Sequence, residues 1–481
     1  MRAAPGRQVT AVSCTTLRAR FAARLSRLYG QEVPAYTTLV EVSREVNEEV
    51  LRRDGATAEQ LGSVARVTAE RHGAIRVGTV SELSQVARVF GALGMHPTGF
   101  YDLRDTRPHP VPVVSTAFRP LAREELAQNP FRVFTSMLVP EDRRFFDDDL
   151  GPRLQAFLAS RQLFPADLLE LADRAADDGE LSQPDAERFL DLATAAFALS
   201  DDPVDRAWYA ELGRVSGVAA DIGGVRTTHV NHLTPRVLDI DRLDAAMTGR
   251  GVEMLGAIQG PPRWDGPDVL LRQTSFRALS EPRTFREADG ELQQGSLRVR
   301  FGEVESRGVA LTGSGHERYD QLVATVDRAL DDDAGASRAD VAPAVWRVGM
   351  PSTYRELERQ GLAHFTYRVA DTLPGGPVPS TRERLVDDGW VCIEPVVYED
   401  FLPRSAAGIF SSNLTGVGQV DDQHGGAPYD ADRLAGALGR PVHAPQDGYA
   451  AQVAASWVGA CVELGVHPSA FPDAPGAPAR G

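Results

Sequence analysis

The chain of 481 residues is 42% hydrophobic and 25% charged, so it can bury a large core and form roughly two to four domains or one elaborated domain. Its formal net charge of −16 argues against nucleic acid or an anionic membrane surface as a partner, because both call for a basic patch. All 51 basic residues are arginine, and the absence of lysine excludes Schiff-base, pyridoxal-phosphate and P-loop lysine chemistry.

The three cysteines, Cys14, Cys392 and Cys461, lie far apart and in no metal-binding or redox spacing. We therefore expect buried or free thiols and a cytoplasmic protein, because the cytoplasm keeps thiols reduced. No stretch of the sequence is long and apolar enough to span a membrane. The sequence carries no signal of a particular oligomeric state.

The first hundred residues are predicted to be mainly helical after a short disordered start. The third helix should stop at Gly73, and a short strand should follow near 75–77. His72 and Arg76 would then lie on a sharp helix-to-strand turn that could present both side chains to one cavity. The alternative for His72 is a helix-end cap. Apolar residues at helical spacing, together with capping boxes, predict helices over 17–28, 38–51, 58–72 and 79–94.

The middle of the chain changes from strands to helices. Residues 97–136 are predicted to be rich in strands and loops, with strands near 111–114 and 131–134. Pro112 restricts the first of these to a sheet edge, since proline cannot donate a ladder hydrogen bond. Residues 149–218 carry acidic, helical patterns and are predicted to form a helical insertion that packs on a sheet as a scaffold.

The stretch 228–236 concentrates side chains that are capable of chemistry, including two histidines. In a strand, His232 would share one face with Val230, while His229 and Asn231 would share the other. Only one of the two histidines should therefore reach a given cavity, and alternation leaves open which one. The alternative is a polar loop that holds two histidines by chance.

The clearest strand alternation in the chain covers residues 297–305, where Glu303 and Glu305 continue an otherwise apolar face. A carboxylate buried at such a position requires a metal ion or an arginine as its partner. The alternative is that the strand has reached the surface by Glu303.

Helical and strand patterns both occur along the chain, and we expect an α+β fold. Further strands are predicted near 269–276 and 391–397, and a last helix over about 450–464. Residues 467–481 are rich in proline, alanine and glycine, so we expect a disordered tail. Residues 1–466 are expected to form a single elaborated catalytic domain.

Three separated residues suggest a metal site. If His72, one histidine of the central stretch and Glu303 meet, they form the facial triad of two imidazoles and one carboxylate that is typical of non-haem Fe(II) oxygenases. The same ligand types also suit a catalytic zinc ion with a bound water. A nearby Arg76 could hold a substrate carboxylate bidentately, as in a 2-oxo dicarboxylic acid. The alternative for Arg76 is a structural salt bridge.

Short motifs spread over nearly the whole chain carry a resemblance to a known family. They lie at residues 31–34, 71–79, 115–119, 130–136, 231–236, 271–276, 300–303, 398–403 and 405–410. In this order they resemble the iron-dependent 2-oxoadipate dioxygenase/decarboxylases, also called 2-hydroxyglutarate synthases.

The resemblance implies which residues form the site. It implies Fe(II) ligands at His72, His232 and Glu303, and thereby prefers His232 over His229. It also implies that Arg76 and Ser405 help to bind the oxo acid.

One position departs from the family pattern. The family usually carries an apolar residue beside the substrate where this chain has Arg404. If the Arg404 side chain enters the pocket, the preferred chain length or charge of the substrate could change.

The resemblance also implies a fold and a reaction. It implies a central mixed β-sheet similar to that of vicinal-oxygen-chelate enzymes and hydroxymandelate synthase, wrapped by many helices. The implied reaction converts 2-oxoadipate and O₂ to 2-hydroxyglutarate and CO₂, a step in lysine breakdown. Two alternatives remain: a zinc-dependent hydrolase or lyase that uses the same ligands without O₂, and a non-catalytic oxo-acid-binding relative.

Overall fold

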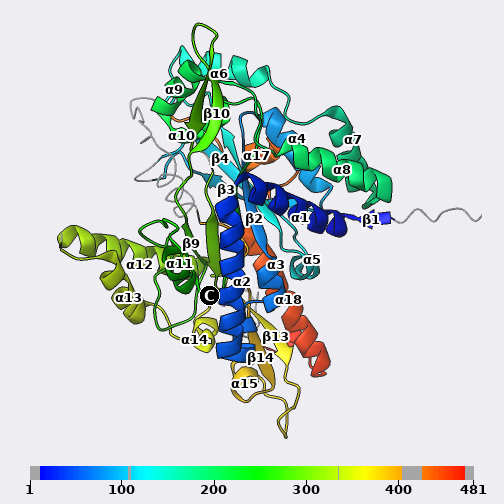
Figure 1. Ribbon diagram of the computed structural model, residues 1–481. Coiled ribbons are helices and arrows are strands. Elements are labelled where there is room, and N and C mark those ends of the chain that lie inside the picture. The colour runs from blue at the N-terminus through cyan, green and yellow to red at the C-terminus, as the bar shows by residue number, and fades with distance from the viewer. Residues whose placement is uncertain (1–10, 107–109, 299, 334, 403–424, 472–481) are drawn as a thin grey trace, which may run out of the picture.

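The chain forms an α+β fold around a central mixed β-sheet, which confirms the expected class (Figure 1). The expected disordered start at residues 1–10 lies outside the part of the chain that the structure describes. None of the described helices is long and apolar enough to cross a membrane. The computed structural model describes residues 11–106, 110–298, 300–333, 335–402 and 425–471.

The described chain contains both strands and helices. The strands are β1 (Ala11–Ser13), β2 (Arg71–Val77), β3 (His96–Asp102), β4 (Val113–Arg119), β5 (Arg132–Leu138), β6 (Glu180–Ser182), β7 (Val204–Asp205), β8 (Val230–Pro235), β9 (Leu271–Ser275), β10 (Glu281–Arg286), β11 (Leu292–Leu297), β12 (Glu303–Arg307), β13 (Phe365–Val369) and β14 (Val391–Pro395). The helices are α1 (Cys14–Glu32), α2 (Pro34–Asp54), α3 (Val64–Ala69), α4 (Val80–Gly91), α5 (Arg123–Gln128), α6 (Leu150–Ala159), α7 (Ala166–Asp178), α8 (Gln183–Ala196), α9 (Arg206–Val215), α10 (Gly217–Gly223), α11 (Ile240–Gly249), α12 (Gly313–Asp332), α13 (Arg338–Gly349), α14 (Tyr354–Arg359), α15 (Arg382–Asp387), α17 (Ala431–Leu438) and α18 (Pro445–Glu463), with 3₁₀ turns η1 (Gly55–Glu59) and η2 (Pro468–Ala470).

The central sheet has five strands in the order β3-β4-β5-β2-β8. Strands β2 and β5 are parallel, while the other neighbours are antiparallel. Both faces are buried, because alternate residues of β2, β4 and β5 enter different hydrophobic clusters. On β5, Val133 and Met137 pack with helices α1, α2, α4, α7 and α8 on one face, whereas Phe134 and Leu138 pack with α6, α9 and α10 on the other. A sheet covered on both sides can hold polar groups away from water.

A β-bulge in strand β8 decides which way the central histidines point. His232 pairs with Ala74 of β2, but the next pairing joins Ile75 to Val230, so Asn231 is an extra residue. Val230 consequently packs on the face opposite to His232, and the predicted sharing of one face by these two residues is wrong. The bulge places His229 and His232 on the same side of the sheet.

Several predicted elements near the site differ from the observed ones. The helix predicted over 58–72 ends at Ala69, and His72 and Arg76 lie inside β2 rather than on a turn. Pairing of β2 with two neighbouring strands outweighs the local helical pattern. Likewise, Pro112 does not mark a sheet edge, because β4 begins one residue later and pairs on both sides.

The alternation over residues 297–305 also does not form one strand. Strand β11 ends at Leu297, and β12 begins at Glu303 and pairs with β9 in a separate two-stranded sheet. The first part of the expected disordered tail is ordered, since residues 468–470 form η2 and the Phe471 ring packs edge-on against Trp457 at 5.1 Å. Residues 472–481 lie outside the described ranges.

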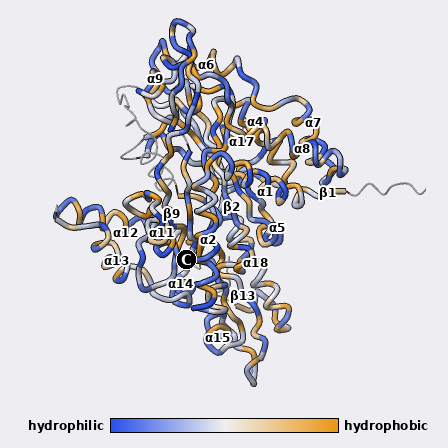
Figure 2. The backbone as a smooth tube through the Cα atoms, in the orientation of Figure 1, coloured by the Kyte–Doolittle hydropathy of each residue, from blue (hydrophilic) through white to orange (hydrophobic). Residues whose placement is uncertain are grey.

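Other predictions of local structure are confirmed. Residues 149–218 form the helices α6 to α9 and the start of α10. Thr79 and Glu82 make the predicted capping box at the start of α4. Figure 1 shows α12 and α13 projecting on one side of the central sheet and α7 and α8 on the other. Hydrophilic and hydrophobic residues alternate along these outer helices (Figure 2), as expected for helices with one buried face.

Candidate metal centre

Three buried side chains from three strands converge beside the central sheet. His72 and His232 project from the adjacent strands β2 and β8, and Glu303 is the first residue of β12. Glu303 Oε1 lies 3.3 Å from His72 Nε2, and Glu303 Oε2 lies 3.5 Å from His232 Nε2. One potential ligand atom from each residue lies within 4.8 Å of the other two. In the described part of the chain, this is the one such group of His, Cys, Asp and Glu side chains.

The cluster fits a divalent metal ion in spacing and in charge. Ligand atoms bound at right angles to one ion at about 2.1 Å lie about 3 Å apart. Burial raises the pKa of Glu303, although His72 opposes this effect, so a cation beside the carboxylate would favour its charged form. Burial, together with the charges of His72 and Arg76, holds the pKa of His232 well below its usual value. His232 is therefore neutral, which is the form that binds metals.

A second carboxylate lies behind His72. Glu305 Oε2 lies 2.9 Å from His72 Nδ1, in an orientation that does not form a hydrogen bond. Burial alone would lower the pKa of His72, but Glu305 and Glu303 outweigh burial and raise it above the usual value. A metal ion that binds His72 Nε2 would therefore displace a proton.

Glu305 belongs to a buried ion-pair network. Arg307 donates from Nε to Glu305 Oε1 at 2.7 Å and from Nη2 to Oε2 at 2.9 Å. Arg132 Nη1 lies 3.5 Å from Glu305 Oε1 and 2.7 Å from Glu70 Oε1. Because the carboxylates and guanidinium groups compensate each other, the network can stay charged inside the fold. Its members are Arg66, Glu70, Arg132, Arg236, Glu305, Arg307 and Glu399.

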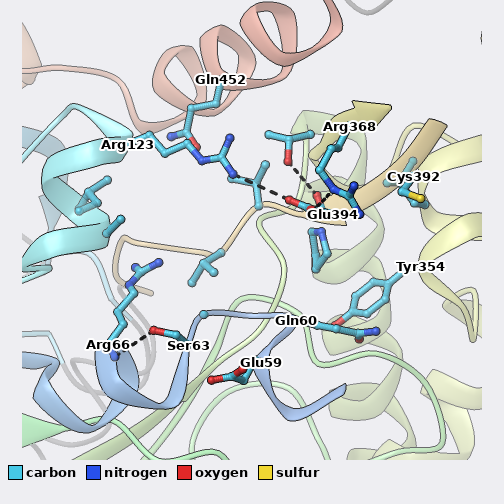
Figure 3. Close-up of a pocket in the computed structure, with 18 of the residues that line it drawn as sticks. Glu59, Gln60, Ser63, Arg66, Arg123, Tyr354, Arg368, Cys392, Glu394 and Gln452 are labelled. Atoms are coloured by element: carbon cyan, nitrogen blue, oxygen red, sulfur yellow. Dashed lines mark hydrogen bonds and ion pairs between the residues drawn. The ribbon is translucent and has the colours of Figure 1, made fainter. Parts of the chain in front are cut away.

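The outer end of this network reaches a cavity of about 550 Å³ (Figure 3). Arg66 and Glu399, which form an ion pair, both line this cavity. On its far side, Arg123 and Arg368 lie 3.9 Å and 3.2 Å from carboxylate oxygens of Glu394 on β14. The three converging residues of the metal centre are not among the residues that line it. The cavity is therefore separate from the metal centre, and the buried ion-pair network extends from one to the other.

Arg76 lies beside the metal centre in a second polar cluster. Its Nη1 forms an ion pair with Asp221 of α10, which confirms the structural salt bridge considered for this residue. Asn231 donates from Nδ2 to Asp221 Oδ2 at 2.8 Å, and His229 Nε2 lies 3.3 Å from Asp221 Oδ1. Burial would raise the pKa of Asp221, but His229 and Arg76 lower it far below its usual range. The ion pair with the Asp221 carboxylate thus holds the Arg76 guanidinium in place.

Aromatic rings enclose the two imidazoles. The Phe401 ring packs edge-on against His72 at 5.0 Å, and the Phe301 ring lies 5.1 Å from His232. Tyr29 donates from its hydroxyl to the carbonyl oxygen of Phe301 at 2.7 Å. These contacts restrict the orientation of both imidazole rings and exclude water from their sides.

Strand β9 fixes the position of Glu303. Gln273 donates from Nε2 to Glu303 Oε1. Gly302, the residue before Glu303, approaches Phe276 so closely that a Cβ atom on Gly302 would lie 1.8 Å from the Phe276 ring. Phe276 N also donates to the carbonyl oxygen of Gly302 at 2.9 Å. A glycine is therefore required immediately before the carboxylate.

The comparison with known protein families agrees with this geometry. A family model described as 2-oxoadipate dioxygenase/decarboxylase matches residues 21–413. The chain belongs to the 2-oxoadipate dioxygenase/decarboxylase family. This confirms the resemblance carried by the sequence motifs.

Individual members of the family cover nearly the whole chain. The 2-oxoadipate dioxygenase/decarboxylase of Mycobacterium tuberculosis is 57% identical over 429 residues, which span 89% of this chain and 94% of the relative. The enzyme of the same name from Pseudomonas putida is 40% identical over 421 residues, or 85% and 89% of the two chains. The crystal structure of hydroxyglutarate synthase from Pseudomonas putida in complex with 2-oxoadipate matches with a TM-score of 0.82 and 37% identity, and covers 95% of this chain and 99% of that one.

The structure brings together some of the predicted residues. His72, His232 and Glu303 converge. Arg76 lies close enough for its positive charge to lower the pKa of His232. Arg404 and Ser405 lie outside the described residues.

Sequence reasoning missed two neighbours of the site. Asp221 follows a segment that was interpreted as scaffold, and no local pattern distinguishes it. Gln273 lies inside one of the family motifs, at residues 271–276, and this motif was the available signal.

Proposed function

We propose that this protein is an Fe(II)-dependent dioxygenase that converts 2-oxoadipate and O₂ to 2-hydroxyglutarate and CO₂. The observation that carries the proposal is the convergence of two imidazoles and one carboxylate within 4.8 Å, in a chain of a family whose relatives are named for this reaction. The reaction balances, because the two oxygen atoms of O₂ account for the extra oxygen in the products. We further propose that the enzyme acts in the cytoplasm in lysine breakdown, and that residues 1–466 form one catalytic domain.

In this proposal, His72, His232 and Glu303 would hold the iron, as two imidazoles and one carboxylate do in non-haem Fe(II) oxygenases. Bound Fe(II) would supply the electrons that activate O₂. Gln273 holds one oxygen of Glu303, so the carboxylate has a fixed direction. The Phe401 ring beside His72 keeps water from that side of the site.

Arg76 would bind the distal carboxylate of the substrate. Its guanidinium already binds the carboxylate of Asp221, and a planar guanidinium can bind more than one oxygen atom through its five N–H groups. Asp221 is itself held by Asn231, so Arg76 is not free to swing toward the iron. Ser405 would add a hydrogen bond to the substrate, and Arg404 would border the substrate chain.

Oxygen consumption tests this function directly. Protein loaded anaerobically with Fe(II) should consume O₂ and release CO₂ when 2-oxoadipate is added, and the product should be 2-hydroxyglutarate. 2-Oxoglutarate serves as the comparison substrate. If O₂ is consumed only with another oxo acid, the iron chemistry is retained and the changed substrate preference is assigned to Arg404. No consumption with any oxo acid, despite bound metal, would refute the proposal in favour of a zinc enzyme or a binding protein.

Replacing His232 by alanine tests the metal centre. The variant His232→Ala should lose bound iron and turnover together, because two ligands retain the ion far less well than three. His229→Ala is the matched control, since His229 lies on the same side of the sheet but contacts Asp221 rather than Glu303. Retention of both iron and turnover by His232→Ala would refute the ligand assignment.

A further inference from the structure

Glu305 and Glu303 contact the two nitrogen atoms of one imidazole from opposite sides. They lie two positions apart on β12, so both carboxylates point to the same side of the strand. Glu303 faces His72 Nε2 at 3.3 Å, and Glu305 faces His72 Nδ1 at 2.9 Å. The first contact belongs to the metal centre. The second contact is made at the other ring nitrogen, Nδ1, which faces away from a metal ion bound at Nε2.

Two arginines hold Glu305 in place. Arg307 binds both carboxylate oxygens, at 2.7 Å and 2.9 Å, and Arg132 lies 3.5 Å from one of them. All three side chains are fully buried. A carboxylate that accepts hydrogen bonds at both oxygens cannot rotate freely. The position of Glu305 relative to His72 is therefore determined by Arg307 and Arg132.

The second histidine has no comparable support. Neither His72 Nδ1 nor His232 Nδ1 forms a hydrogen bond in the described structure, but a carboxylate oxygen lies 2.9 Å from His72 Nδ1 only. The two imidazoles of the proposed site are thus unequal: one has a fixed carboxylate at its rear nitrogen, and the other is confined by packing against Phe301. A rear carboxylate selects the tautomer with hydrogen on Nδ1, which leaves the lone pair of Nε2 for the metal.

We propose that Glu305 is a positioning residue of the metal centre, which orients the His72 ring and fixes its tautomer through Nδ1. This inference rests on the proposed metal site. At 2.9 Å, Glu305 Oε2 lies within hydrogen-bond distance of His72 Nδ1, so rotation of the ring would be enough to form the bond. Loss of such a rear carboxylate typically weakens metal binding by about 10- to 100-fold.

Metal affinity measured without turnover tests the proposal. Metal-free wild-type protein and the variants Glu305→Asp and Glu305→Gln would be titrated with Co(II) against a competing chelator, and the visible spectrum of the Co(II) complex recorded. Glu305→Asp keeps the charge for Arg307 but withdraws the oxygen from His72, so it remains informative if Glu305→Gln does not fold. Both variants should raise the Kd for Co(II) by about 10- to 100-fold and change the Co(II) spectrum.

Glu70→Gln is the matched control. Glu70 is equally buried and shares Arg132 and Arg307 with Glu305, but no contact joins it to His72 in the described structure. This variant should bind Co(II) within about threefold of wild type. Equal weakening by Glu70→Gln and Glu305→Asp would show that the network acts only through general stability, and would overturn the proposal. Unchanged affinity of Glu305→Asp would overturn it as well. Retained binding in His232→Ala would instead show that the metal site itself is wrong.

Discussion

Removing one charge from the buried ion-pair network should lower stability strongly. Glu70 lies 2.7 Å from Arg132, 3.0 Å from Arg236 and 3.6 Å from Arg307. Burial alone would raise the pKa of Glu70, but these arginines and Arg66 outweigh burial and lower the pKa from 4.5 to about 2. The lowered pKa corresponds to roughly 3 kcal/mol of stabilisation of the charged form. Breaking a buried ion pair by removing one partner typically costs about 3–5 kcal/mol, which is the loss of stability expected here.

The variant Glu70→Gln keeps the side-chain shape and removes the charge. For a chain of 481 residues, the entropy of unfolding is about 1 kcal/mol per degree, so the expected decrease in Tm is roughly 3–5 °C. Thermal unfolding followed by circular dichroism would measure it. The matched control is Glu48→Gln on α2, where Glu48 pairs with Arg44 at 2.8 Å but both side chains are more than half exposed. That variant should change Tm by less than about 0.5 °C.

The pH dependence gives the prediction a sign. The folded pKa of Glu70 lies below its unfolded pKa, so its stabilisation is fully present above about pH 4.5 and is lost as the pH falls toward 2. The difference in Tm between wild type and Glu70→Gln should thus stay constant from pH 8 to about pH 5 and shrink only below that. A difference of less than 1 °C at pH 7, or one that already shrinks between pH 8 and pH 6, would contradict the reasoning.

Three further predictions follow from other contacts. Arg76→Ala should raise the KM for 2-oxoadipate by at least about tenfold and leave bound iron unchanged, because Arg76 pairs with Asp221 rather than with a metal ligand; loss of iron in this variant would contradict its assigned role. Gly302→Ala should weaken metal binding in a chelator competition assay, since the new Cβ would overlap the Phe276 ring and displace the strand that begins at Glu303; an unchanged Kd would show that β9 can adapt. Phe471→Ala should lower the free energy of unfolding, measured with denaturant, by about 2–3 kcal/mol. Leu292→Ala, at an exposed position, should change it by less than about 0.5 kcal/mol. Equal effects would show that Phe471 is not part of the core.

Local patterns in the sequence predicted parts of the site but not its geometry. Glu303 and Glu305 were recognised because carboxylates continued an apolar face, and the structure pairs one with two imidazoles and the other with Arg307. The β-bulge at Asn231 could not be predicted, because the extra residue depends on pairing with β2. Simple alternation consequently placed His229 and His232 on opposite faces, although both lie on one side.

The errors in predicted elements have a shared cause. His72 follows a helical pattern, yet it lies in a strand because β5 and β8 both pair with residues 71–77. The choice between a helix and a strand was made by partners more than fifty residues away in the sequence. The same holds for Asp221, whose importance is visible only once α10 lies against Arg76. Motif resemblance favoured His232 where local patterns left two candidates, and His232 is the one that lies beside Glu303.

The proposed ligands come from two different sheets, since His72 and His232 lie in the five-stranded sheet and Glu303 in the β9–β12 pair. One bound ion would therefore add a link between two sheets, which already touch at the bridge between Arg236 and Glu305. By mass action, free metal at 100 times its Kd adds about 2.7 kcal/mol to the free energy of unfolding. The supply of this metal would then affect the lifetime of the protein as well as its activity, because a cell removes its unfolded chains continuously.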